Sequence, residues 1–472
     1  MKKNQVTIIG NNVASLVAGT TLAEQGYQID LINPLHNWGG HFGGVTFQDA
    51  QFDYGMTFFE FDSFQPTQSY DVLTYDPSLR NDSGRFTSLI KDYVEQLIVT
   101  KLVPKPKMLL KGILVNDLMI SNDLSGLMTL SDEAKQALKK DLSTIVVNSD
   151  KSLHAAKKLK NNLFAINNFQ PVSVANHGIT FHNIFIEAFS KKVLFKSSSD
   201  FLALYHRAVW LPLYYPETLL SQFEIIPQIL KTTQFHYPSQ GYIGALVDAL
   251  LMKAQNNSNI TIYKKSIASL LLNNCYRTQC SDGSAFETNQ LVWNLDLSSL
   301  LKAIGTNQQA VNYQKASITL CFIGVATEKV NVEFSTLFVL DEDYLSYRIT
   351  NQNVCAGSDL SLTKLVVEFN TDFALSTQII TEAQIRARIE YELVKLNIIE
   401  LKESVQYFYC KYVKNALMIP NQYNYDCFML ERGELLEKCP NIQLNGSASG
   451  FMSTSLNDQI IQGLQIAKAL ED

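Results

Sequence analysis

Residues 6–15, VTIIGNNVAS, decide the fold. The β-branched run of residues 6–9 predicts a strand that stops at Gly10, and apolar residues then recur at helical spacing as far as Gly26. Residues 28–33 read as a second strand, and the joining helix is short enough for a right-handed parallel crossover. The first 33 residues therefore predict a βαβ unit.

The turn after the first strand has the position, but not the full composition, of a dinucleotide-binding turn. Such a turn uses three glycines to approach a pyrophosphate, a helix N-terminus that faces this anion, and an acid after the second strand for the ribose. Here Asn12 and Ser15 replace two of the glycines, and Asn33 stands at the acid position. Asn tolerates left-handed geometry and Ser is small, so the turn can form; a βαβ unit without a ligand is the alternative. The predicted contacts are Gly10, Asn12, Val13, Ala14, Ser15 and Asn33.

The composition is that of a globular protein large enough for two lobes. Of the 472 residues, 46% are hydrophobic and 18% are charged. The net charge is −6 and no stripe of Lys and Arg is present, which argues against a nucleic-acid partner. No apolar run reaches the roughly 18 residues of a membrane-spanning helix, so we expect no transmembrane segment. A peripheral membrane contact and the oligomeric state are left open.

The N-terminal residues and the cysteines favour the cytoplasm. Residues 1–5 lead directly into a strand with no apolar leader, so we expect no secretion. The seven cysteines include no C-x-x-C pair, and no histidine stands at metal-ligand spacing. Free thiols in a reducing compartment and no metal site are the prediction.

The remaining sequence predicts a discontinuous two-domain organisation. Residues 60–230 show mostly helical periodicity, and a βα rhythm returns near residue 240. Strand-like segments follow at 316–324, 335–340 and 364–369, and Thr381 with Gln384 predicts a capping box. We assign residues 1–60, 232–300 and 411–472 to a nucleotide-binding domain, and residues 61–231 and 301–410 to a substrate-binding lobe with a helical insertion.

Further motifs carry a family resemblance. A paired glycine in residues 38–44 (WGGHFGG) precedes the stretch FDYG at 52–55, and residues 237–242 (YPSQGY) lead into a helix and a strand. Together with residues 442–447 (IQLNGS) and the helix start at 455–460, these motifs resemble flavoproteins of the amine oxidase, protoporphyrinogen oxidase and phytoene desaturase type. The C-terminal run is also similar to the UDP-galactopyranose mutase branch, although Ser447 replaces the charged residue expected in either group.

This resemblance implies an α/β fold. Its parts are a Rossmann-like FAD/NAD(P)-binding domain, a discontinuous α+β substrate lobe and a helical insertion. It further implies a non-covalent FAD between the lobes, with the substrate above the flavin ring. The implied cofactor contacts, besides the turn, are Gly39, Gly40, His41, Ile267, Trp293, Gly446, Ser447, Ser455 and Leu456.

Aromatic residues beside a cation are the candidates for substrate contacts. Arg207 precedes the aromatic run 210–216, and Arg348 follows Tyr347 on a predicted strand of the substrate lobe. Rings offer flat apolar faces, and an arginine can hold a phosphate or a carboxylate. The alternatives are a packed helix end with a surface arginine and a cation at a sheet edge. The candidates are His41, Arg207 and Arg348 for catalysis and Tyr214, Tyr215, Tyr242 and Tyr347 for substrate binding.

Three functions follow from these observations. The first is an FAD-dependent oxidoreductase acting on a small organic substrate, with a sugar or nucleotide-sugar derivative as one candidate. The second is a flavin-dependent sugar isomerase similar to UDP-galactopyranose mutase. The third is a flavoprotein-like fold that has lost FAD and serves as a binding or partner protein, which Asn12, Ser15, Asn33 and Ser447 favour.

Overall fold

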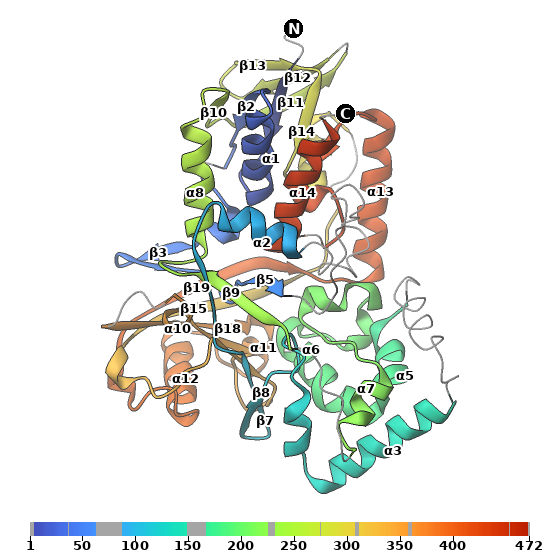
Figure 1. Ribbon diagram of the computed structural model, residues 1–472, viewed down its shortest axis with the longest axis vertical. Helices are drawn as coiled ribbons and strands as arrows, with labels where there is room; N and C mark the ends of the chain where they lie inside the picture. The colour runs from blue at the N-terminus through green and yellow to red at the C-terminus, as the bar shows by residue number, and fades with distance from the viewer. Residues whose placement is uncertain are drawn as a thin grey trace.

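Two lobes stacked along the long axis make up the protein (Figure 1). The computed structural model describes residues 4–35, 37–62, 87–148, 167–224, 232–273, 275–306, 311–356, 361–452 and 454–470. The upper lobe in Figure 1 carries both ends of the described chain, and the lower lobe carries a second sheet and a block of helices.

The upper lobe is built on a five-stranded parallel sheet. Its strand order is β10-β2-β1-β14-β20, and every neighbouring pair is parallel. The strands are β1 (Gln5–Ile9), β2 (Gln28–Ile32), β10 (Ile260–Tyr263), β14 (Gln290–Trp293) and β20 (Gln443–Leu444). The predicted βαβ unit is confirmed, and segments from separate parts of the chain complete its sheet.

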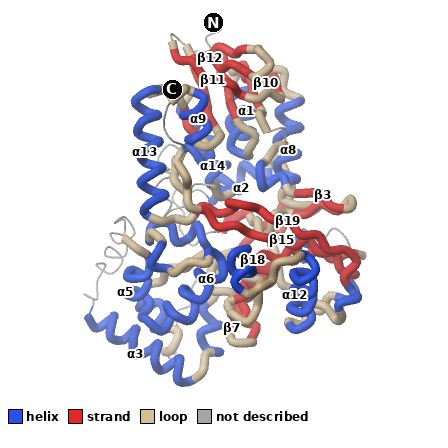
Figure 2. Tube along the Cα trace, turned by 180° about the vertical axis from the view of Figure 1, so that it is seen from behind, coloured by secondary structure: helices blue, strands red, loops and turns tan. Residues whose placement is uncertain are grey.

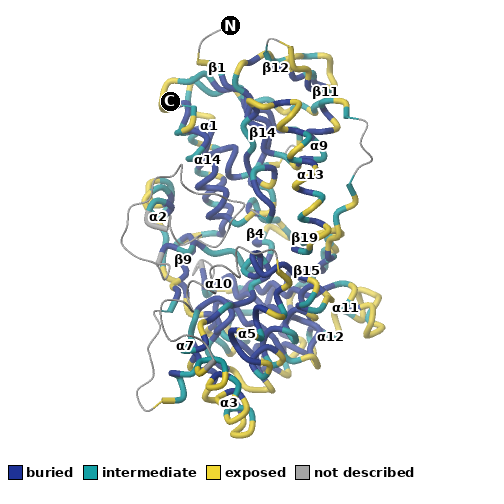
Figure 3. The backbone as a smooth tube through the Cα atoms, turned by 90° about the vertical axis from the view of Figure 1, so that its right-hand side faces the viewer, coloured by how far each residue is buried: buried dark blue, intermediate teal, exposed yellow. Residues whose placement is uncertain are grey.

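Three helices pack together beside this sheet. Helix α1 (Val13–Glu24) packs against α8 (Gly244–Gln255) and α14 (Leu456–Ala469), and most of α1 is buried (Figure 3). A Cβ on Gly463 would lie only 2.6 Å from the Cβ of Val17, so α14 requires glycine at this crossing. The burial of α1 on several faces explains its continuous apolar sequence.

Further elements complete the upper lobe. Strands β11 (Ile267–Leu272), β12 (Tyr276–Cys280) and β13 (Ala285–Thr288) form an antiparallel sheet. Helix α9 (Leu297–Ala303) packs against α13 (Gln422–Lys438), and α2 (Thr87–Glu95) packs against α14. Strands β3 (Val45–Phe47) and β4 (Ala50–Phe52) form a hairpin.

The lower lobe contains a seven-stranded sheet that crosses the waist of the molecule (Figure 2). Its order is β19-β15-β18-β17-β16-β7-β8, antiparallel except between β16 and β7. The strands are β7 (Lys107–Leu110), β8 (Ile113–Asn116), β15 (Lys315–Ala326), β16 (Thr336–Val339), β17 (Arg348–Asn351), β18 (Leu362–Asn370) and β19 (Val405–Met418). The predicted boundary at residue 411 thus falls inside β19.

Helices accompany this sheet in two groups. The first comprises α10 (Gln352–Ala356), α11 (Thr371–Ser376) and α12 (Glu382–Lys395), and α12 starts at the predicted Thr381–Gln384 capping box, which is confirmed. The second comprises α3 (Asp132–Asn148), α5 (Phe169–Phe181), the π-helix η5 (His182–Glu187), α6 (Ala188–Leu194) and α7 (Pro216–Ser221). Short 3₁₀ turns complete the chain: η1 (Gly40–Gly43), η4 (Leu124–Thr129), η6 (Ser198–Asp200), η7 (Ala203–Val209), η8 (Thr327–Lys329), η9 (Lys402–Ser404) and η10 (Gly446–Ala448).

The prediction of a mostly helical segment over 60–230 was incomplete. Strands β7 and β8 extend the large sheet, and β5 (Phe59–Asp62), β6 (Thr100–Leu102) and β9 (Gln234–Pro238) form a sheet of their own. These strands are short, and a pairing between distant strands leaves no local periodicity. Within the described residues, no helix combines the length and the apolarity needed to span a bilayer.

Candidate functional site

A cavity of about 1020 Å³ lies between the two lobes. The upper lobe contributes the loop at Gly40 and His41 and the segment that leads into α14. The lower lobe contributes η7, β17, β18 and β19. The polar residues of its wall include Asn37, His41, Arg207, Tyr347, Arg348, Glu368, Lys411, Ser447, Ser455 and Asn457. This is where the fold brings residues from both lobes within reach of one ligand.

Arg348 is held rigidly at the lower wall of the cavity. Its Nε and Nη2 atoms each donate to the carboxylate of Glu368 at 2.6 Å, and the two side chains are 3% and 4% exposed. The guanidinium also lies 4.1 Å from the ring centroid of Trp210. The third nitrogen, Nη1, is buried and has no hydrogen-bond partner among the described residues. Arg348 therefore keeps one donor for a ligand while Glu368 compensates its charge.

Glu368 also explains a glycine in the FDYG stretch. Gly55 has a φ of +80°, and a Cβ there would lie 2.4 Å from the Glu368 carboxylate. Glu368 was not a sequence candidate, because it directly follows the apolar residues 365–367 of β18. A single acid in a run of this kind, opposite an arginine on the next strand, is the signal that could have identified it.

Two further cations lie on the cavity wall. Arg207, at the end of η7, donates from Nη1 to the carbonyl of Met119 at 3.1 Å. Lys411, on β19, donates from Nζ to the hydroxyl of Tyr54 and lies 4.6 Å from the centre of its ring. The structure thus gathers Arg207, Arg348 and Lys411 around one cavity. Lys411 carries no local motif, so the sequence did not reveal it.

The candidate tyrosines lie in different places. Tyr347 is on the cavity wall and donates to Glu368 at 3.3 Å. Tyr214 is buried, with its hydroxyl donating to the carbonyl of Leu118, and Tyr215 is partly exposed. Tyr242 bonds Asp248 at 3.4 Å. The last three are not among the residues that line the cavity.

His41 reaches the cavity from the glycine loop. Gly39 precedes it with a φ of +80°, and a Cβ there would lie 2.6 Å from Val247 on α8. The residue is exposed and lies on the cavity wall. Its imidazole can therefore donate or accept a hydrogen bond there.

The start of α14 also faces the cavity. Ser455 caps this helix and forms a capping box with Asp458, and Leu456 and Ser447 lie on the wall. Asn457 is 8% exposed and donates from Nδ2 to the carbonyl of Glu60 at 3.3 Å. Its Oδ1 atom is buried without a partner among the described residues. Asn457 therefore offers an acceptor at the upper end of the cavity.

The dinucleotide turn differs from the cavity wall, because side chains of the protein fill the turn. The amide of Asn12 donates to Asn294 Oδ1 at 2.6 Å, and Asn294 donates to Ser15 Oγ at 2.8 Å. The N–H of Val13, the first residue of α1, donates to the side chain of Gln459 at 3.1 Å. Ser15 N donates to Asn12 Oδ1 at 3.1 Å. Two of the first three N–H groups of α1 are therefore satisfied inside the protein.

The loop after β20 closes this turn from the other side. A Cβ on Gly446 would lie 2.1 Å from Asn294 Oδ1 and 2.6 Å from Asn12 Nδ2. Gly446 is thus packed directly on the pair of amides. None of the residues 10–15 lines the cavity, so the cavity ends before it reaches the turn.

The remaining predicted contacts on this side are also engaged. Asn33 is fully buried; its Nδ2 donates to the carbonyl of Asn37 at 2.9 Å and its Oδ1 accepts from Leu35 N at 2.9 Å. Trp293 is 1% exposed and donates to the carbonyl of Asp296. Ile267 pairs with Cys280 on β12. Neither of these two lines the cavity.

The structure therefore fits the flavin end of FAD, but it does not fit the adenosine and pyrophosphate end. Gly40, His41, Ser447, Ser455 and Leu456, which the family resemblance assigns to the flavin side, lie on the cavity wall. The residues assigned to the adenosine and pyrophosphate side are hydrogen-bonded inside the protein, and the N–H groups of Val13 and Ser15 already have acceptors there. They also lie outside the cavity.

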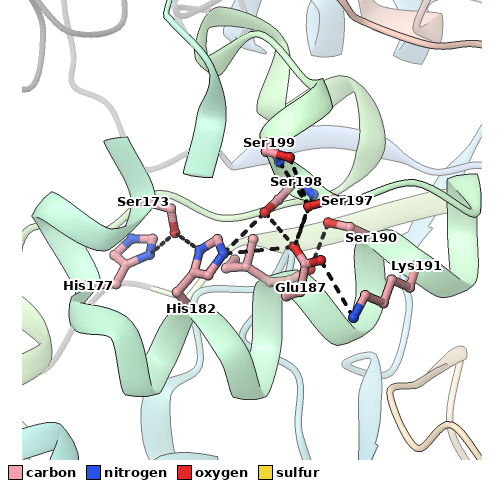
Figure 4. A network of polar contacts seen from close by, with 10 residues as sticks. Ser173, His177, His182, Glu187, Ser190, Lys191, Ser197, Ser198 and Ser199 are labelled. Carbon is pink, nitrogen blue, oxygen red and sulfur yellow. Dashed lines mark hydrogen bonds and ion pairs between the residues drawn. The ribbon is translucent and has the colours of Figure 1, made fainter. Parts of the chain in front are cut away.

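A second polar cluster lies in the helical block (Figure 4). Tyr214 N donates to His177 Nε2 at 2.8 Å, so Nδ1 of that ring carries the proton and donates to Ser173 Oγ at 3.1 Å. Ser173 then donates to His182 Nδ1, His182 to Ser198 Oγ, and Ser198 to Glu187 at 2.6 Å. Every donor is used within the chain, and Ser198 is buried. The cluster connects η5 to its neighbours and presents no accessible nucleophile.

Comparisons with known proteins identify the fold. Residues 8–75 match the family of NAD(P)-binding Rossmann-like domains. The structure of reduced UDP-galactopyranose mutase superposes with a TM-score of 0.74 at 12% identity, over 99% of this chain and 96% of that one. A protein from Exiguobacterium sp. assigned as protoporphyrinogen oxidase gives 0.65 at 14% identity, over 100% and 99%. Putrescine oxidase bound to putrescine gives 0.61 at 12% identity, over 99% of each chain.

These likenesses show a shared fold. No protein with a curated description matches the sequence. The expected Rossmann-like domain with a second lobe is confirmed, and the fold is shared with the solved structures of UDP-galactopyranose mutase and putrescine oxidase.

Proposed function

We propose that this chain binds a small anionic organic molecule in the cavity between its lobes, with Arg348 and Arg207 holding the anionic group. The observation that carries the proposal is the Nη1 atom of Arg348, a buried donor without a partner. A buried donor of this kind costs roughly 1–3 kcal/mol when it is left unsatisfied. A carboxylate or phosphate oxygen would satisfy it with a charge-assisted hydrogen bond.

The rest of the cavity wall narrows the ligand class. Trp210, Phe58 and Tyr313 offer ring faces, and Asn457 and His41 offer polar atoms. Rings with nearby hydrogen-bonding groups suit a sugar ring, so a sugar phosphate or a nucleotide-sugar derivative is the favoured class. Tyr347 stays a proposed substrate contact, and Tyr214, Tyr215 and Tyr242 stay predictions. The cytoplasmic location and the domain boundaries also stay predictions.

The test is ligand binding to the full chain and to an Arg207→Gln variant. Calorimetry with a panel of sugar phosphates, nucleotide sugars and neutral sugars should find binding of anionic members only. Loss of Arg207 should weaken that binding about tenfold or more, because one charge-assisted hydrogen bond is removed. Arg277→Gln, at a pair on β12 and β13 outside the cavity, is the matched control. Equal affinity of both variants for the anion would contradict the proposal.

An FAD-dependent oxidoreductase is the second candidate. The cavity wall at Gly40, His41 and Ser455 favours it, because the family resemblance assigns these residues to the flavin. A bound flavin would supply the electron acceptor, and the chain would orient the substrate through Arg207 and Arg348. A flavin-dependent sugar isomerase would use the same groups. Absorption near 450 nm in the purified protein would support both, and a requirement for reduced flavin would distinguish the isomerase.

A further inference from the structure

We propose that the side chains of Asn12, Asn294 and Gln459 occupy the place that a dinucleotide pyrophosphate takes in this fold. The chain then binds neither FAD nor NAD(P), which excludes the second candidate function, and its cavity ligand lacks an ADP group. The inference narrows the ligand class of the proposed function but does not rest on the cationic residues that carry it.

The first step of the argument concerns the start of α1. In a βαβ nucleotide site the N–H groups of this helix bind the pyrophosphate anion. Here Val13 N donates to Gln459 Oε1 at 3.1 Å, and Gln459 is 5% exposed. Gln459 lies on α14, which packs along α1, so the amide is delivered by a neighbouring helix. A neutral carbonyl oxygen therefore satisfies the donor that would face the anion.

The second step concerns space. Asn12 stands where a nucleotide turn has its second glycine, the residue that lets the backbone approach the pyrophosphate. Its amide joins Asn294 at 2.6 Å, and Gly446 lies against both. The three strands β1, β14 and β20 thus meet at their carboxyl ends through side chains. A dinucleotide lying across these ends would have to separate them.

The third step concerns the ribose. Asn33, at the acid position, is fully buried, and both atoms of its amide are bonded within residues 33–37. Because it is fully buried, it presents no acceptor to a ribose hydroxyl. Residue 33 is uncharged, and its amide is hydrogen-bonded inside the protein. The pyrophosphate position and the ribose position are therefore each filled by the protein, through contacts that do not depend on one another.

The experiment compares the full chain with a variant that opens the turn. Calorimetric titrations use ADP, FAD and FMN as probes, and the variant is Asn12→Gly with Asn294→Ala and Gln459→Ala. Glycine is tolerated at a helix N-cap, so α1 should still form. The wild-type chain should give no saturable binding of ADP or FAD up to about 1 mM, and the variant should gain affinity for ADP of roughly tenfold or more. Gln28→Ala, which removes an amide pair at the other end of β2, should gain none.

Two results would overturn the inference. Saturable binding of ADP or FAD by the wild-type chain is one, and a folded variant that still ignores ADP is the other. If the triple variant fails to fold by circular dichroism, Gln459→Ala alone is measured against the same criterion. A wild-type chain that ignores ADP and also binds no anionic ligand would remove the proposed function while leaving this inference in place.

Discussion

The dinucleotide turn and the central cavity treat their polar groups in opposite ways. At the turn, Asn12, Asn294 and Gln459 form hydrogen bonds with other parts of the upper lobe. On the cavity wall, Arg348 Nη1 and Asn457 Oδ1 are buried without partners among the described residues. Since buried polar groups are normally paired, the two unpaired atoms on the cavity wall are free to bond a ligand. A fold can therefore retain one half of a binding site while its other half becomes internal packing.

The largest expected effect is on the free energy of unfolding. It tests whether Arg348 stabilises the fold in addition to its proposed role in ligand binding. Arg348→Met leaves the buried Glu368 carboxylate without its cation, which should lower the free energy of unfolding by about 3–5 kcal/mol in urea titrations. Adding Glu368→Met should recover at least half of this loss. Arg386→Met, at a pair in which the arginine is 49% exposed, should change stability by less than about 1 kcal/mol. If Arg348→Met lowered the stability by less than about 1 kcal/mol, the Arg348–Glu368 pair would not be holding the cavity wall in place.

The second prediction extends the comparison to a fully paired carboxyl group. Asp53 is 2% exposed; its Oδ1 accepts from Ile243 N at 3.0 Å and its Oδ2 is bonded to the Tyr237 hydroxyl. Burial raises the pKa of Asp53 to about 7, while both hydrogen bonds act in the opposite direction. The protonated form is therefore favoured in the folded state, and stability is lost as the pH rises toward 7.

Asp53→Asn imitates the protonated carboxyl and should remove this loss. Because one pKa unit corresponds to about 1.4 kcal/mol, the variant should gain about 2–3 kcal/mol over wild type between pH 5 and pH 8. Denaturant titrations across that range measure the difference. Asp49→Asn, an exposed position on the same hairpin, should follow the wild type. A constant difference at every pH would mean that Asp53 is ionised throughout.

The smallest expected effect comes from a substitution in the dinucleotide turn, which should lower the stability of the fold without changing ligand affinity. Asn294→Ala removes hydrogen bonds to Asn12 and Ser15 and should cost about 1–2 kcal/mol of folding free energy. It should leave the affinity for the anionic cavity ligand unchanged, because Asn294 does not line the cavity. Melting curves and calorimetry on the same preparation give both values. Weaker ligand binding would indicate that the turn and the cavity are coupled.

Local patterns predicted the local parts of the structure. The β-branched run before Gly10 predicted β1, the spacing after it predicted α1, and Thr381 with Gln384 predicted the start of α12. Capping and periodicity act within a few residues, so a single sequence carries them completely. The substitutions at Asn12, Ser15 and Asn33 predicted an altered nucleotide turn, and this stays a prediction.

The long-range contacts could not be predicted in this way. Gln459 bonds Val13 across 446 positions, and Asn294 bonds Ser15 across 279. Nothing near Gln459 distinguishes it from an ordinary polar residue of a helix. Lys411 reaches the cavity only because β19 pairs with β15, and this pairing is set by the whole sheet. The composition of the turn suggested an altered site, but only the fold shows what fills it.

The strand order of the parallel sheet has a consequence for synthesis on the ribosome. β1, α1 and β2 are translated first, but β20 and α14 follow only after the entire lower lobe. Until residues 443–469 leave the exit tunnel, α1 has no α14 to cover its apolar surface. The face of α1 that α14 covers therefore stays unpaired until the last helix in the sequence has been made. Termination before α14 would leave that surface open to aggregation.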